Sequence, residues 1–189
     1  MRIDKKLNLV YTVEREDGEV LYIHSTPLGR MVFEKYYMVI ARAFSRVYGG
    51  GLSHVAGPSV AAYLLKDTAL AMEAWDGLDG VEQGLMNEII RNSKVIAPSP
   101  TGWAPMPLDT AISREVFSED ERAEFLNAIC FFILASCVHR RSMLASHLAA
   151  MNGLWGTQTT LLGYTDFVSS LPISTGTVSS KMAGLQVPS

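Results

Sequence analysis

The sequence predicts a mainly α-helical, bundle-like domain with one small β-hairpin near its N-terminus. Two long segments, Arg30 to Tyr48 and Glu121 to Val138, are apolar over most of a helical circumference, which is typical of buried helices. Before them, residues 7–24 alternate apolar and polar side chains around Asp17-Gly18. An Asp-Gly pair supplies the positive φ angles of a tight turn, so this part is expected to be a hairpin.

Composition narrows the classes of protein to which the chain can belong. Its 189 residues are 48% hydrophobic, with 16 Lys and Arg against 19 Asp and Glu, a net charge of −3. This balance disfavours nonspecific nucleic-acid binding and excludes wholesale disorder, and two cysteines do not make a disulfide scaffold. The longest apolar stretch is too short to span a membrane, and the N-terminus lacks the apolar core of a signal peptide. We expect a soluble, intracellular protein.

The first elements follow from periodicity and glycine. In the hairpin, Leu7, Leu9, Tyr11 and Val13 share one face. The helix over 30–48 ends at three consecutive glycines, residues 49–51, because glycine tolerates the left-handed conformation that closes many helices.

The next two helices are predicted from their start signals. Pro58 is placed to open a helix over Val60 to Trp75, since proline suits a first turn. Asp79, with Glu82 three residues later, forms a variant of the capping box before a helix over Val81 to Ser93.

Four prolines and Gly102 exclude a helix between residues 95 and 107, and the pattern leaves open whether this loop forms a second hairpin. A short helix over 108–117 is expected next. Ser118 and Glu121 then form a capping box for the long helix that ends at Cys137 or Arg140.

The C-terminal part divides into a structured portion and a tail. A helix is expected over Met143 to Met151, followed by a mixed segment to Leu171. Residues 173–189 are rich in Ser, Thr, Gly and Pro, so we expect a flexible tail that is dispensable for folding. The predicted organisation is one domain, residues 1–172, and this tail.

The candidate chemical sites all have simpler structural interpretations. Gly49-Gly50-Gly51 follows a helix, whereas a phosphate-binding loop precedes one. Ser53-His54 has no nucleophile elbow and no acidic partner at a recognisable spacing. Asp76, Asp79 and Glu82 form an acidic cluster that could hold a cation, but two of the three are more simply explained as helix stop and start residues. The chain is therefore not expected to be an enzyme or to hold a cofactor.

The soft metal ligands are also interpreted structurally. Cys130 and Cys137 lie roughly 10 Å apart on one helix, too far for a disulfide, and His139 and His147 lack the usual zinc spacing. No metal site is predicted. His139, with the two arginines after it, complements the negative end of the long helix.

The nine methionines permit an adaptable binding surface, but most of them are expected in the core because they fall on apolar helix faces. Met86 and Ile90 lie beside the apolar stripe of Leu85 and Ile89 on a helix that is otherwise polar. We therefore select Met86 and Ile90 as the residues expected to contact a partner, either a second copy of the chain or a helical protein.

Five segments, taken in order after the hairpin, resemble the tail assembly chaperones of long, flexible-tailed bacteriophages. The segments lie across residues 1–172, and none of them is a catalytic motif. They are Leu28-Gly29-Arg30, Val32-Phe33-Glu34-Lys35-Tyr36-Tyr37, Val55-Ala56-Gly57-Pro58, Gly84-Leu85-Met86-Asn87-Glu88-Ile89 and Leu154-Trp155-Gly156-Thr157-Gln158-Thr159-Thr160.

The resemblance implies a largely helical, non-catalytic protein that binds the tape measure protein and recruits tail tube subunits. It also implies action in the host cell cytoplasm, absence from the mature virion, and in many cases a longer form made by translational frameshifting.

Two other functions stay open at this stage. One is a structural virion component, such as a tail tube, tube-terminating or head-joining protein. Proteins of this class normally contain more β-strands than the sequence predicts. The other is a small enzyme with a site built from Ser53, His54 and the carboxylates, which the missing motifs disfavour.

Overall fold

The computed structural model describes residues 6–139, 141–152 and 154–172, and it shows an α+β domain rather than the predicted helical bundle. Of these residues, 57% are helical and 19% lie in strands. The strands form one antiparallel sheet in the order β4-β3-β2-β1-β5. They are β1 (Asn8–Glu14), β2 (Val20–Ser25), β3 (Ser93–Ser99), β4 (Gly102–Pro107) and β5 (Thr157–Thr160).

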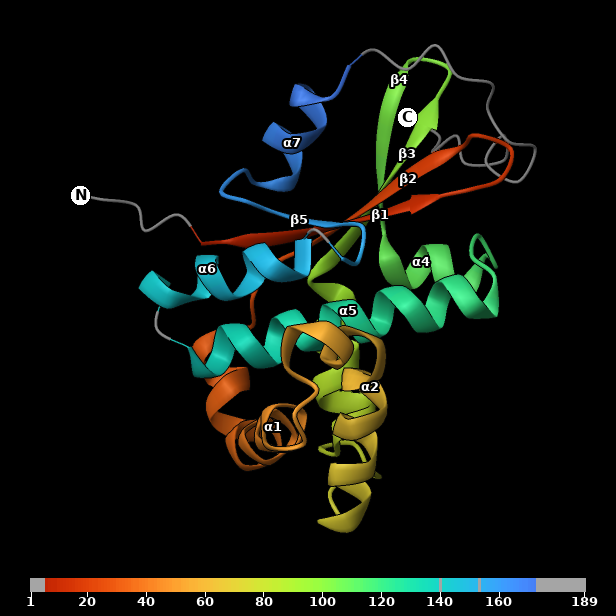
Figure 1. Cartoon of the computed structure of the whole chain (residues 1–189). Helices are drawn as coiled ribbons and strands as arrows, with labels where there is room; N and C mark the ends of the chain where they lie inside the picture. Colours follow the sequence, from red (N-terminus) through yellow and green to blue (C-terminus); the bar gives the residue numbers. More distant parts are fainter. Residues whose placement is uncertain (1–5, 140, 153, 173–189) are drawn as a thin grey trace.

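The helices lie in layers on both sides of the sheet. In Figure 1 the sheet separates α7 from α5 and α6, and α1 and α2 lie beyond α5. The helices are α1 (Arg30–Gly49), α2 (Ser53–Ala71), α3 (Asn87–Arg91), α4 (Leu108–Ser113), α5 (Glu119–Val138), α6 (Arg141–Asn152) and α7 (Tyr164–Ser170), and a π-helix, η1 (Val81–Met86), precedes α3.

The predicted N-terminal hairpin is confirmed, and it contributes two of the five strands. β1 pairs with β2 from Leu9↔Ser25 to Glu14↔Val20. At the turn, Gly18 has φ +83° and its N–H donates to the carbonyl of Arg15, which explains the glycine. Leu9, Tyr11 and Val13 point into the main core, as their alternation predicts.

The proline-rich segment is a second hairpin, which the sequence left undecided. β3 pairs with β4 from Lys94↔Pro107 to Ser99↔Gly102, and β3 also pairs with β2. β4 lies at the edge of the sheet, where proline is tolerated because it has no N–H to give to a further strand. The predicted sheet is smaller than the observed one because the sequence leaves this second hairpin open and gives no signal for β5.

Two of the predicted helices have different boundaries or geometry. α2 begins at Ser53, seven residues before the predicted start, and Pro58 lies inside it. The segment after residue 80 starts as the π-helix η1, and its N-cap is Gly80 with no side-chain hydrogen bond. The predicted capping role of Asp79 is therefore wrong. The predicted tail, residues 173–189, lies outside the described residues.

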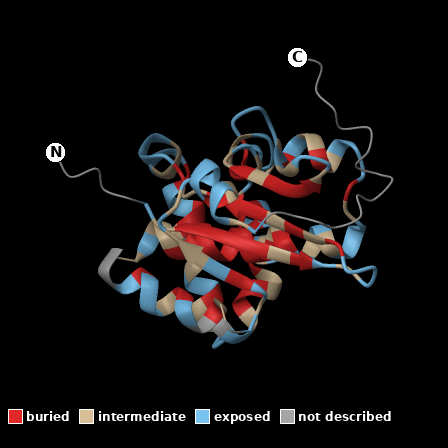
Figure 2. Ribbon diagram, turned by 90° about the horizontal axis from the view of Figure 1, so that it is seen from above, coloured by how far each residue is buried: buried red, intermediate tan, exposed pale blue. Residues whose placement is uncertain are grey.

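Helix α5 is the centre of the main core. Its capping box is present as predicted: Glu121 N–H donates to Ser118 Oγ, and Ser118 N–H donates to the Glu121 carboxylate. Phe125, Phe131 and Phe132 are fully buried along it. Figure 2, seen from above, shows buried residues running along the strands, with exposed residues on the surrounding turns and loops.

The other face of the sheet carries a smaller core under α7. Phe167 of α7 packs edge-on against Tyr22, and Tyr22 also contacts Trp103. His24 is buried, and its Nε2 is 3.0 Å from the carbonyl oxygen of Leu162. Burial lowers the pKa of His24, so this cluster favours a neutral imidazole.

Candidate functional site

A surface hollow of about 400 Å³ lies between the first half of α1 and the loop that leaves α2. Its floor includes Tyr36 and Val39, which are buried, and its walls carry several charged groups. The lining residues are Lys35, Tyr36, Met38, Val39, Glu73, Ala74, Asp76, Gly77, Asp79 and Gly80.

The loop over residues 72–80 is held in one shape by backbone hydrogen bonds. Val81 N–H donates to the Ala74 carbonyl at 2.8 Å, which closes the ends of the loop on each other. Glu73 and Gly77 have φ of +53° and +93°, so the chain reverses at both positions. The wall of the hollow is therefore a compact turn rather than an extended linker.

Tyr36 fixes this loop to α1. Its hydroxyl donates to the carbonyl oxygen of Asp79 at 3.1 Å. A Cβ atom on Gly84 would lie 1.7 Å from that hydroxyl oxygen, so only glycine fits at the first turns of η1. Segments that are 43 or more residues apart in sequence are thus joined at one buried side chain.

The charges around the hollow are mainly negative. Glu73, Asp76 and Asp79 contribute three carboxylates, against the single ammonium group of Lys35. Lys35 donates to Asp79, and this ion pair lowers the pKa of Asp79 and raises that of Lys35. Both groups are exposed, so the pair adds little to stability. Glu73 and Asp76 are left as negative groups beside an apolar floor.

Large apolar side chains of α1 and of the loop over residues 72–80 are exposed. Leu78, at the tip of the loop, is 87% exposed, and Met31 and Met38 on α1 are 84% and 55% exposed. Tyr37, also on α1, is half exposed and packs edge-on against Phe33. These four exposed side chains of α1 and the loop (Met31, Tyr37, Met38 and Leu78) are called the apolar rim, and Met38 is the one that lines the hollow.

The residues selected from the sequence lie close to this site but do not line it. Met86, the last residue of η1, and Ile90 on α3 are half-buried and pack against the main core. Their role in partner binding stays a prediction. Asp76 and Asp79 do line the hollow, although the sequence favoured only capping roles for them.

Among the described side chains, the histidines and cysteines do not form a common site. His139 and His147 stack with ring centroids 4.1 Å apart, beside Phe44 and Tyr48, so packing explains their position. Burial raises the pKa of the Cys130 thiol to about 12. No group of three His, Cys, Asp or Glu residues suited to a metal occurs within the described parts of the chain.

The remaining candidates are helix ends. Gly50 caps α1, and Ser53 is the first residue of α2. The side chain of His54 lies outside what the structure describes, as does Arg140. In the described ranges, no helix is long and apolar enough to cross a membrane.

The sequence did not indicate Lys35, Tyr36 or Glu73 as site residues. Their only local signal is the turn at Asp76-Gly77, because the hollow depends on the contact between Tyr36 and a glycine far along the chain. Comparison with models of protein families, with curated proteins and with solved structures gives no match.

Proposed function

We propose that this protein is a non-catalytic tail assembly chaperone of a long-tailed bacteriophage, which binds the tape measure protein and recruits tail tube subunits. The observation that carries the proposal is the apolar rim, Met31, Tyr37, Met38 and Leu78, which the fold leaves uncovered. A chaperone needs such a surface, because it must shield apolar segments of a partner until the final subunits replace it.

The arrangement of the resembling segments supports the same proposal. Val32 to Tyr37 begins α1, and Gly84 to Ile89 spans η1 and α3. These two segments meet where Gly84 accommodates the Tyr36 hydroxyl, next to the hollow. A third segment, residues 55–58, places Gly57 against Phe131 of α5. The resembling residues therefore shape the core and the site.

The direct test is co-expression with the tape measure protein and, separately, with the tail tube protein of the same phage. We expect the chain to co-purify with the tape measure protein and to increase its soluble fraction. A chain that stays monomeric and captures neither protein would contradict the proposal.

One observation favours the alternative, a structural virion component. Such a role was disfavoured because few strands were predicted, and the five-stranded sheet removes that objection. The two functions differ in where the protein ends up. A structural component is found by mass spectrometry in purified virions, whereas a chaperone is found only in lysates of infected cells.

A further inference from the structure

The hollow between α1 and the loop over residues 72–80 combines an apolar floor with an acidic border. Tyr36 and Val39 are buried at its base, and Met38 and Leu78 leave apolar surface beside it. Lys35 is engaged by Asp79, so the carboxylates of Glu73 and Asp76 dominate the remaining charge. An occupant that complements both features carries an apolar side chain with cationic groups on either side.

The shape of the rim selects a helix over an extended strand. Met31, Lys35 and Met38 lie at i, i+4 and i+7 on α1, so they form one stripe along a rigid cylinder. Stripes of this kind pack against the ridges of a second helix. The hollow is built from α1 and a loop, with no sheet edge at which a strand could be added.

We propose that this hollow is the docking site for a basic amphipathic α-helix of the partner protein. An apolar side chain of that helix enters between Met38 and the loop carrying Leu78, and its Lys or Arg residues face Glu73 and Asp76. This inference rests on the proposed function and assigns a site and a partner chemistry to it. It also places the contact on α1 and the loop rather than on Met86 and Ile90.

The test uses two synthetic peptides of about five helical turns with the same leucine pattern. One peptide has Lys at its polar positions and the other has Glu. Fluorescence anisotropy with the full chain is expected to give a Kd at least about tenfold lower for the Lys peptide, a preference that weakens as salt is added. Equal affinities for the two peptides would overturn the proposal.

Variants of the hollow distinguish docking of the Lys peptide at this site from nonspecific electrostatic attraction of the peptide to an acidic protein. Leu78→Asp adds a negative charge, so it strengthens nonspecific attraction, yet docking predicts weaker binding of the Lys peptide. Removing two charges at the hollow with Glu73→Asn and Asp76→Asn is expected to reduce binding about tenfold or more. Asn also suits the positive φ of Glu73.

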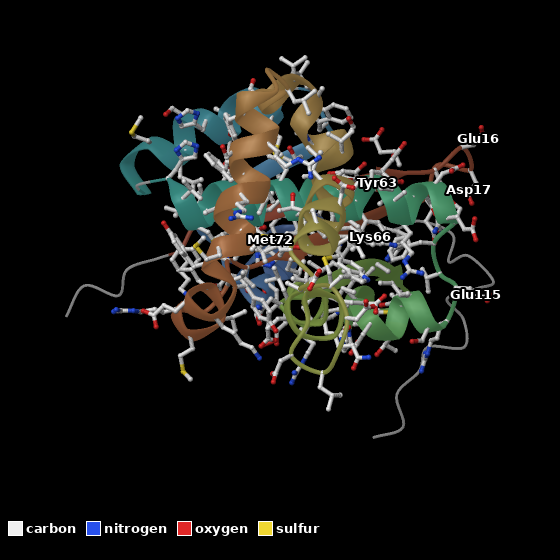
Figure 3. All side chains as sticks on the ribbon, turned by 90° about the horizontal axis from the view of Figure 1, so that it is seen from below. Glu16, Asp17, Tyr63, Lys66, Met72 and Glu115 are labelled. Carbon is white, nitrogen blue, oxygen red and sulfur yellow. The ribbon has the colours of Figure 1, made fainter. Side chains whose placement is uncertain are left out.

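The matched control removes two charges at the other end of the molecule. Glu115→Asn replaces a second exposed glutamate with φ +53°, and Glu16→Gln removes one negative charge from the hairpin turn. Figure 3 shows Glu16 and Glu115 together at one edge of the lower face, away from Met72, the residue before Glu73. The control is expected to bind the Lys peptide like the wild type. Equal losses in both double variants would refute a specific site.

The same variants distinguish failure of the site from failure of the function. Loss of tape measure capture by Leu78→Asp supports both proposals. If Leu78→Asp still captures the tape measure protein, the chaperone function stands and this site is wrong. If the wild type captures neither phage protein, the proposed function fails, whatever the peptides show.

Discussion

Helices α1 and α5 are both 20 residues long and both were predicted to be central, but they occupy different layers. α5 lies between the sheet and the outer helices and is buried at ten consecutive or nearly consecutive positions from Phe125 to Ala135. α1 is covered on one side only, which leaves Met31 and Met38 exposed. The position of an apolar helix in the fold therefore decides whether its side chains are buried in the core or stay exposed, where a partner can contact them.

The largest effect is expected where α5 is covered on every side. Phe132 is fully buried, so Phe132→Ala should lower the free energy of unfolding by about 3 to 5 kcal/mol. Chemical denaturation followed by circular dichroism measures this change. A variant as stable as the wild type would show that α5 is not the packed centre.

The next largest loss of unfolding free energy is expected where α2 and α5 approach each other closely. A Cβ atom on Gly57 would lie 2.5 Å from Cε2 of Phe131, so Gly57→Ala pushes α2 away from α5. Overpacking of this kind costs about 1 to 3 kcal/mol. Gly29→Ala is the matched control, because a Cβ there meets nothing within 4 Å. Equal unfolding free energies for the two variants would contradict the close approach.

A smaller loss of unfolding free energy is expected when Phe44 on α1 is replaced. The sequence suggests the same large effect as at Phe132, but Phe44 is only half-buried, stacking on Tyr48 with ring centroids 4.4 Å apart. Phe44→Ala should therefore cost about 1 to 2 kcal/mol, near half the value for a fully buried aromatic side chain. A loss equal to that of Phe132→Ala would place α1 inside the core after all.

Unlike the helix substitutions above, a substitution in the sheet at His24 is expected to change how the stability of the protein depends on pH. Burial lowers the pKa of His24 below that of the unfolded chain, and Lys94 lies opposite it on β3. Neutral His24 makes its whole contribution to the unfolding free energy at pH values above the pKa of histidine in the unfolded chain, which is about 6.5. This contribution is lost as the pH falls through that value, because the unfolded chain then binds a proton more readily than the folded protein. His24→Gln keeps an N–H donor for Leu162 without titrating, so its stability should fall less between pH 7.5 and 5. Parallel losses would contradict this assignment.

Local signals in the sequence were sufficient for the elements with local causes. The turn at Gly18 and the capping box of Ser118 and Glu121 depend on residues a few positions apart, and both occur as predicted. β4 stayed undecided because the prolines in it are compatible with an edge strand, and the place of a strand in the sheet is a property of the whole fold. β5, Thr-Gln-Thr-Thr, has no apolar alternation to reveal it.

The candidate site was less predictable because its parts are distant in sequence. Asp76 and Asp79 attracted notice as an acidic cluster, but the hollow requires Tyr36 to reach across to residues 79 and 84. The exposure of Met38 likewise depends on which helices cover α1. No periodicity within α1 distinguishes a side chain covered by α5 from one left for a partner.

The decisive measurement compares folding and capture in one variant of α1. Met31→Ser combined with Met38→Ser removes two exposed side chains, so the melting temperature should stay close to that of the wild type. Co-purification with the tape measure protein should be largely lost in the same variant. A clear fall in melting temperature, or undiminished capture, would contradict the claim that this face of α1 serves a partner rather than the fold.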